Sequence, residues 1–291
     1  MAAQLLQFLF AGLTSGAIYA LAGLGFAIIY NASGVINFAQ GEFIMIGGMA
    51  AATLTASGMP LPLAALVAVA GTMLVGMALE KLAIEPARDS DTVSVIIITI
   101  GASIFLRGLA QLAWGKGFHT LPAFSGEVPL AVLGASLMPQ SLWVLGVSLA
   151  VIVLLWWFFN RTLFGKAMLA TSHNRLAAEL VGIAAKRVLL AAFALSALLG
   201  AVGGVVVAPI TFANTEAGIM LGLKGFAAAV LGGLGNGFGA IVGGLAVGVA
   251  EALAAGTLSS AYKDAIAFII ILAVLIFRPQ GIFGRKKVDR V

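Results

Sequence analysis

Residues 160–187 form a polar, basic segment between apolar stretches that are each long enough to span a bilayer. The segment, called the polar loop below, reads NRTLFGKAMLATSHNRLAAELVGIAAKR. Apolar runs of about twenty residues recur on both sides of it and predict transmembrane helices, which satisfy every backbone polar group internally. The chain is therefore predicted to be an all-α, polytopic membrane protein. We expect it to form one transmembrane domain over 1–291 and to present the polar loop to a partner in the cytoplasm.

The composition excludes several other classes of protein. Of the 291 residues 62% are hydrophobic and only 9% are charged, whereas soluble domains carry roughly 25% charged residues. The short alternating strands of an outer-membrane barrel are not present. The net charge of +5 comes from basic residues in a few loops, so no nucleic-acid partner is expected. With no cysteine and only two histidines, His119 and His173, we expect no catalytic residue and no metal site.

Nine apolar stretches are candidate spans, separated by breaks rich in glycine and proline. They are 5–30, 35–56, 61–80, 93–114, 141–159, 187–208, 221–235, 239–256 and 263–277. The stretch 221–235 is short and glycine-rich, so 221–256 is either two crossings or a re-entrant hairpin. The expected count is therefore eight or nine, and nine is the simpler. Glycine pairs four residues apart, such as Gly12/Gly16, Gly200/Gly204 and Gly244/Gly248, predict close helix packing.

The basic residues indicate which loops share one side of the membrane. If the polar loop is cytoplasmic, alternation places residues 81–92 and the C-terminal tail on the same side. That side then holds Lys81, Arg88, Arg161, Lys166, Arg175, Lys186, Arg187, Arg278, Arg285, Lys286, Lys287 and Arg290. The opposite side holds only Lys116, Lys224 and Lys263. The positive-inside rule favours this orientation, with the N-terminus outside and the C-terminus in the cytoplasm.

The first part of the polar loop, residues 163–168, is expected to be the end of a span followed by a turn. Further on, Ser172 or Asn174 can cap a short helix over 174–181 by accepting backbone N–H bonds. Gly182 then stands where a helix C-terminus favours a left-handed residue.

The predicted short helix is amphipathic. Leu176 and Leu180 share one face, and Arg175 and Glu179 are spaced to form an ion pair. Such a helix can dock into a groove of a partner protein, or it can lie on the lipid headgroups. The pattern alone leaves both interpretations open.

Asn37, Gln40 and Glu42 begin the second candidate span and are candidates for a translocation path or gate. An ionisable group in the membrane is costly and therefore a functional candidate. Glu42 could instead cap the start of its helix, where the helix dipole favours a carboxylate. Because this segment is expected near the cytoplasmic end of the span, capping or gating is favoured over substrate contact.

The remaining charges near the spans have simpler interpretations. Arg107 and Glu251 could form a pair, or Glu251 could reach water from an outer helix end. Residues 214–216, Lys224 and Lys263 are expected in solvated positions.

Three stretches resemble the branched-chain amino acid ABC transporter permease family of the LivH type. They are GLTSGAIYALAGLGFAIIYNASGVINFAQGEFIMIGG from Gly12, the polar loop over 165–183, and LGGLGNGFGAIVGG from Leu231 together with RPQGIF from Arg278. The resemblance runs nearly end to end. At the position of Gln40 the family commonly has histidine.

The resemblance implies an importer permease fold in a bacterial inner membrane. The expected partners are a second permease subunit, two cytoplasmic ATPase subunits and a periplasmic binding protein. The polar loop would contain the coupling helix that contacts an ATPase, with candidate residues Asn174, Arg175, Leu176, Ala178, Glu179, Leu180 and Gly182. This chain has no Gly-x-x-x-x-Gly-Lys-Ser/Thr loop, so no cofactor is expected on it, and ATP and Mg²⁺ would bind the partner subunits.

The leading hypothesis is thus a permease subunit that moves branched-chain or other small amino acids. The same kind of permease could serve urea, amides or aromatic acids. A self-contained secondary carrier is less favoured, because few charges within the spans could form a relay. An intramembrane enzyme ranks last, because no His-Glu-x-x-His or Ser/His pattern is found.

Overall fold

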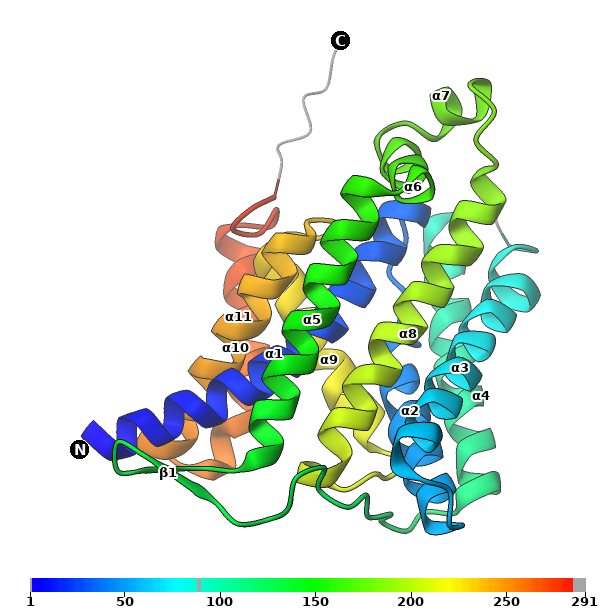
Figure 1. Ribbon diagram of the computed structural model, residues 1–291. Helices are drawn as coiled ribbons and strands as arrows, with labels where there is room; N and C mark the ends of the chain where they lie inside the picture. Colours follow the sequence, from blue (N-terminus) through cyan, green and yellow to red (C-terminus); the bar gives the residue numbers. More distant parts are fainter. Residues whose placement is uncertain (1, 88–89, 285–291) are drawn as a thin grey trace.

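The computed structural model describes residues 2–87 and 90–284, and nearly all of its regular structure is helical (Figure 1). The helices are α1 (Ala2–Ser33), α2 (Gln40–Ala56), α3 (Leu61–Leu79), α4 (Thr92–Trp114), α5 (Pro139–Arg161), α6 (Leu163–His173), α7 (Arg175–Leu180), α8 (Ala185–Thr211), α9 (Ala217–Gly232), α10 (Gly237–Thr257) and α11 (Lys263–Phe277). A π-helical turn, η1 (Glu80–Ile84), extends α3, and a 3₁₀ turn, η2 (Ser260–Tyr262), precedes α11. A small hairpin pairs β1 (Leu130–Val132) with β2 (Ala135–Leu137). The prediction of an all-α membrane protein is confirmed.

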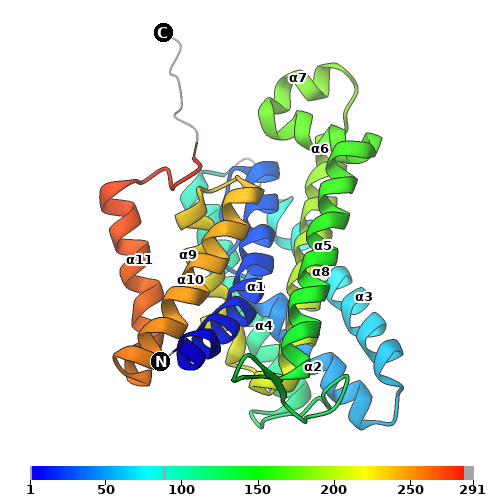
Figure 2. The ribbon, with the colours of Figure 1, turned by 60° about the vertical axis from the view of Figure 1, so that its left-hand side comes forward.

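Seven of the described helices are long and apolar enough to cross a membrane: α1, α3 with η1, α4, α5, α8, α10 and α11 with η2. The shorter α2 and α9 pack within the same bundle, so nine of the described helices form it. Figure 2 shows α6 and α7 projecting from one end, called the α7 end below, and the N-terminus at the opposite end. The hairpin β1–β2 also lies at that opposite end (Figure 1).

Glycine lets α10 pack directly against α1. A Cβ on Gly244 would lie 2.4 Å from the backbone nitrogen of Ala20, and a Cβ on Gly248 would lie 2.4 Å from Cα of Gly16. Side chains at these positions would force the backbones apart, and in lipid close van der Waals packing drives helix association. The predicted packing role of these glycine pairs is confirmed.

The segment 221–256 makes two passes through the bundle rather than a re-entrant hairpin. At the α7 end, the side chain of Asn31 donates to the carbonyl of Gly235 in the turn between α9 and α10, at 2.7 Å. At the opposite end, Gly256 lies against Phe8 near the start of α1. The turn itself uses Gly233 and Gly235 in left-handed conformations, with φ of 101° and 86°.

The α7 end also gathers the described basic residues of the polar loop and its neighbours. Glu85, which follows η1, bridges Lys81 at 2.7 Å and Lys186 at 3.2 Å, and so ties the end of α3 to the start of α8. Arg161, Lys166 and Arg175 follow on α5, α6 and α7. The predicted cytoplasmic residues Arg88, Arg285, Lys286, Lys287 and Arg290 lie outside the described residues.

Candidate functional site

The second helix begins inside the bundle, not at its end. After α1 the chain turns back over residues 34–39 without helical structure, and α2 starts at Gln40. The Gln40 side chain, which is fully buried, donates to the carbonyl of Ser196 at 3.1 Å and bonds the Ser196 hydroxyl. Ser196 is about 16 Å along α8 from its start, at the usual helical rise of 1.5 Å per residue. The expectation that this segment lies near the end of a span is therefore wrong.

A glycine on α1 makes room for Gln40. A Cβ on Gly25 would lie 2.2 Å from Nε2 of Gln40, and the Gly25 carbonyl accepts a hydrogen bond from the Ser196 hydroxyl at 3.0 Å. Gln40, Ser196 and Gly25 thus join α1, α2 and α8 through a small group of hydrogen bonds in the interior.

The chain before α2 is also pinned to α4. Asn37, only 1% exposed, accepts from the backbone N–H of Ala39 at 3.1 Å, while its Nδ2 has no partner. The backbone N–H of Phe38 donates to the Thr99 hydroxyl at 3.2 Å. Side chains thus accept hydrogen bonds from two backbone N–H groups of this unwound segment, and non-helical chain inside a membrane needs such partners.

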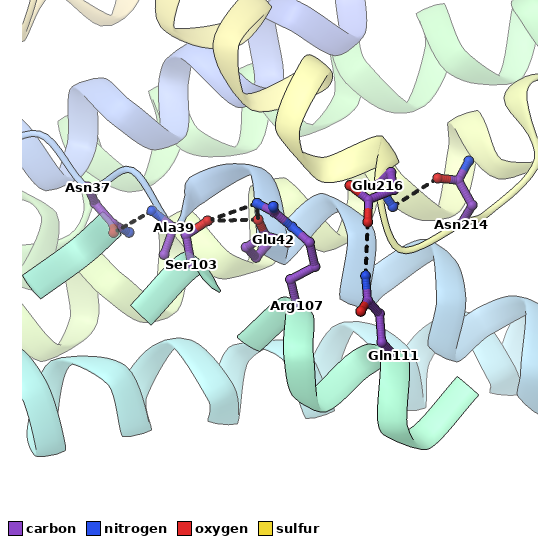
Figure 3. A network of polar contacts seen from close by, with 8 residues as sticks. All are labelled: Asn37, Ala39, Glu42, Ser103, Arg107, Gln111, Asn214 and Glu216. Carbon is purple, nitrogen blue, oxygen red and sulfur yellow. Dashed lines mark hydrogen bonds and ion pairs between the residues drawn. The ribbon is translucent and has the colours of Figure 1, made fainter. Parts of the chain in front are cut away.

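Glu42 forms a buried ion pair with Arg107 (Figure 3). Its Oε1 accepts from Nη2 of Arg107 at 2.6 Å and from the Ser103 hydroxyl at 2.8 Å. The Glu42 side chain is 1% exposed, and that of Arg107 is 21% exposed. The other carboxylate oxygen, Oε2, and Nε of Arg107 have no partner.

This geometry decides two questions that the sequence left open. Glu42 lies in the first turn of α2, where the dipole favours a carboxylate, but its carboxylate bonds α4 and makes no cap with its own helix. Arg107 pairs with Glu42 and not with Glu251. The sequence identified Glu42 and Arg107 as charged residues within spans. It gave no signal for Ser103, because the hydrogen bond from Ser103 to Glu42 depends on how α4 packs against α2.

A cavity of about 180 Å³ lies beside this ion pair. Glu42, Ser103 and Arg107 form its polar wall, and the other walls carry the apolar side chains of Phe26, Phe38, Ile100, Ile104, Ile219, Leu223 and Phe226. Helix α9 reaches α2 through glycine, since a Cβ on Gly218 would lie 3.0 Å from Oε2 of Glu42. The free carboxylate oxygen therefore faces a surface that carries no side chain.

A second buried charge cluster lies among α1, α9, α10 and α11. Lys224 donates to Glu251 at 2.9 Å and to Asp264 at 2.6 Å, and the Tyr19 hydroxyl donates to Glu251 at 2.8 Å. Lys263 approaches Glu251 at 3.4 Å. The expectations that Lys224 is solvated and that Glu251 reaches water are wrong, because the two residues are 5% and 1% exposed.

A larger groove of about 540 Å³ lies between α1, α5, α6 and α10 and is walled mostly by apolar side chains. Its polar side chains Asn31, Asn160 and Ser172 each donate to a backbone carbonyl. None of the residues that line it is charged. This groove therefore fits a hydrophilic solute less well than the cavity beside Glu42.

The polar loop forms two helices where one was expected. Residues 163–173 fold as α6, and the predicted turn over 163–168 is wrong. The cause is a cap that the sequence reasoning missed: the Thr162 side chain accepts from the backbone N–H of Gly165 at 2.9 Å. Such a hydroxyl cap satisfies a donor that the first turn leaves open.

The structure of α7 agrees with its predicted capping. Asn174 is the N-cap and accepts from the backbone N–H of Ala177 at 3.0 Å, whereas Ser172 lies within α6. Arg175 and Glu179 form an ion pair at 3.2 Å. Gly182 follows the helix with φ of 90°, in the left-handed region.

The surface of α7 is unusually apolar for a projecting helix. Leu176, Leu180 and Val181 are 69%, 81% and 77% exposed. Ala178 is buried on the opposite side, where α7 contacts the rest of the chain. One face of α7 thus packs against the rest of the chain, and the opposite, apolar face is exposed on the surface.

Comparison with known proteins places the whole chain in one family. The family model described as "Branched-chain amino acid transport system / permease component" matches residues 8–275. The chain is 35% identical to the high-affinity branched-chain amino acid transport system permease protein LivH of Salmonella typhimurium, over 98% of this chain and 97% of that protein. It is also 35% identical to the high-affinity branched-chain amino acid transport system permease protein BraD of Pseudomonas aeruginosa, over 98% of both chains.

A solved structure shows the same fold. PsaBC from Streptococcus pneumoniae, in complex with a Fab, aligns over 96% of this chain and 97% of its own, with a TM-score of 0.53 and 16% sequence identity. The arrangement of helices is therefore that of a known structure. The family model and the relatives agree over nearly the full length of the chain. The chain belongs to the permease component family of the branched-chain amino acid transport systems.

Proposed function

We propose that this chain is one permease subunit of an ATP-driven importer in a bacterial inner membrane. It would move branched-chain or other small amino acids that a periplasmic binding protein delivers. The curated relatives are permease proteins of branched-chain amino acid transport systems, and the substrate class is carried over from them. The observation that supports the mechanism is α7 with its exposed apolar face.

The α7 face has the chemistry of a docking surface. Three large apolar side chains, Leu176, Leu180 and Val181, are each more than two-thirds exposed. An amphipathic helix of this kind is recognised by lying in an apolar groove of its partner. The ATPase is the partner that an importer requires at this end, because this chain has no phosphate-binding loop of its own.

The charges support a cytoplasmic position for α7. Lys81, Arg161, Lys166, Arg175 and Lys186 all belong to elements at the α7 end, and the positive-inside rule places such an end in the cytoplasm. The N-terminus and the hairpin β1–β2 would then face the periplasm. ATPase subunits are cytoplasmic, so α7 is on the side where they bind.

The test places one charge on the apolar face of α7 and leaves the rest of the loop unchanged. Leu180→Asp places a charge where a partner would bury a leucine, and burial of one leucine contributes about 1.5–3 kcal/mol. In proteoliposomes that contain the assembled importer, we expect the substrate-stimulated ATPase rate and leucine uptake to fall at least about ten-fold. The binding of purified ATPase to the permease should weaken by a similar factor.

The matched control is Leu82→Asp in η1. Leu82 is 78% exposed at the same end of the bundle but on a different element. Docking of α7 is supported if ATP hydrolysis stays coupled to leucine uptake in this control and becomes uncoupled in Leu180→Asp. Normal coupling in Leu180→Asp, in protein that inserts normally, would refute it and would favour a helix that only lies on lipid.

A further inference from the structure

The ion pair of Glu42 and Arg107 is incompletely satisfied. Both described hydrogen bonds to the Glu42 carboxylate go to Oε1, so Oε2 has no partner, and Nε of Arg107 has none either. Glu42 is nevertheless 1% exposed. A buried polar atom without a partner is costly, most of all in a charged group.

The second charge cluster shows that this gap is particular to the first. Both carboxylate oxygens of Glu251 are occupied, Oε1 by Lys224 and Lys263 and Oε2 by the Tyr19 hydroxyl. That cluster has the contacts expected of a structural ion pair. In Glu42 and Arg107, by contrast, one buried acceptor and one buried donor have no partner, and both residues line the cavity.

We propose that Glu42 and Arg107 form a transient subsite for a zwitterionic α-amino acid in transit. The proposal rests on the proposed function and names the residues that would recognise the solute. The α-ammonium group would donate to Oε2 of Glu42, and the α-carboxylate would accept from the Arg107 guanidinium. Hydrogen bonds between charged partners are roughly twice as strong as those between neutral groups.

The rest of the cavity fits the remainder of such a molecule. Its walls beyond the ion pair are aliphatic and aromatic, among them Ile104, Ile219 and Phe226. Its volume of about 180 Å³ is roughly six times the ~30 Å³ that one water occupies in the liquid, enough for a small aliphatic side chain and its head group. A zwitterion also adds no net charge to the membrane interior, where an unpaired charge is expensive.

The absence of cysteine from the natural sequence provides a direct test. Ile104 lines the cavity and is 63% exposed, so Ile104→Cys adds one reactive group at its edge. In the assembled transporter in nanodiscs, we would measure the rate of maleimide labelling with added leucine, 4-methylpentanoate or 3-methylbutylamine. The last two compounds are leucine without its ammonium and leucine without its carboxylate.

We expect leucine to slow the labelling and each truncated compound to need at least about ten times the concentration for the same protection. The double substitution Glu42→Gln with Arg107→Gln, which leaves no unpaired charge, should abolish the difference among the three compounds. The matched control, Lys224→Gln with Glu251→Gln, removes the other buried ion pair of the described residues and should preserve this difference. In saturation-transfer NMR on the same samples, the signal of bound leucine should disappear in the Glu42/Arg107 double variant and persist in the Lys224/Glu251 double variant.

Equal protection by all three compounds would overturn the proposal, because the cavity would then recognise only apolar shape. Selective protection that survives in the Glu42/Arg107 double variant would also overturn it. So would an Ile104→Cys variant that no reagent labels, since the cavity would be closed to any solute. If leucine gives no protection while Leu180→Asp still uncouples the ATPase, the chain remains an importer permease but this subsite is refuted.

Discussion

Among the residues that form ion pairs in α9 to α11, Lys224 is the one whose substitution should lower the stability of the fold the most. Its ammonium group lies between Glu251 at 2.9 Å and Asp264 at 2.6 Å, with the Lys224 side chain 6% exposed and that of Glu251 1% exposed. Lys224→Met keeps most of the length of the side chain but leaves the Glu251 charge buried. Asp264 is half-exposed and can turn to water, so the cost falls mainly on Glu251.

Removal of one partner from a buried ion pair typically costs about 3–5 kcal/mol. Lys263 offsets part of this loss, because its ammonium group is 3.4 Å from Glu251. We therefore expect a loss near the lower limit, about 3 kcal/mol, which corresponds to a fall in melting temperature of roughly 6–12 °C at 2–4 °C per kcal/mol. A second substitution, Glu251→Gln, removes the stranded charge and should recover most of the loss.

The assay is thermal unfolding of the purified single and double variants in one detergent. The control is Lys263→Met, whose side chain is 50% exposed and which should change the stability by less than about 1 kcal/mol. A loss of stability in the double variant as large as in Lys224→Met would refute the argument, because the damage would then come from packing. Equal losses for Lys224→Met and Lys263→Met would refute it as well.

Three further predictions concern local features. Asn174→Ala removes the cap of α7 and should cost about 1 kcal/mol of local stability, seen as faster amide exchange over 175–180; unchanged exchange would contradict the cap. The hydrogen bond from Lys81, with that from Lys186, holds the pKa of Glu85 below its ordinary value. The stability difference between wild type and Glu85→Gln should therefore persist as the pH falls to the ordinary range of a glutamate carboxyl, and it should vanish only below that range. A stability difference that vanishes at higher pH would contradict this. Gly204→Val would place a Cβ 2.0 Å from the Ile44 carbonyl oxygen and should lower the stability by about 1–3 kcal/mol. An unchanged melting temperature would show that α2 and α8 are not so close.

Much of the architecture could be predicted from the sequence, because lipid permits few solutions. The length of the apolar runs determined the number of helices, and the glycine pairs of α1 and α10 determined close packing. The short range of capping chemistry explains why Gly182 was assigned correctly and why Asn174 was one of only two candidate caps. It also explains why α6 was missed, since its cap at Thr162 was overlooked.

The contacts within the bundle could not be predicted in the same way. Arg107 pairs with Glu42, 65 residues away, and Lys224 pairs with Glu251, 27 residues away. These pairings depend on which helices are neighbours in the bundle, and a hydropathy pattern does not indicate the neighbours of a helix. The start of α2 inside the bundle was also missed, because an apolar run gives no sign that its first residues turn back from the end of α1.

The central claim is that this chain imports amino acids only when ATPase subunits drive it. The most direct measurement is uptake of labelled leucine into proteoliposomes with ATP in the ATPase compartment. The chain would be reconstituted with the second permease, the ATPases and the binding protein encoded in its own genome, and then without the ATPases. We predict concentrative uptake by the complete assembly and none without the ATPases, whereas uptake at a comparable rate without the ATPases would contradict the proposed function.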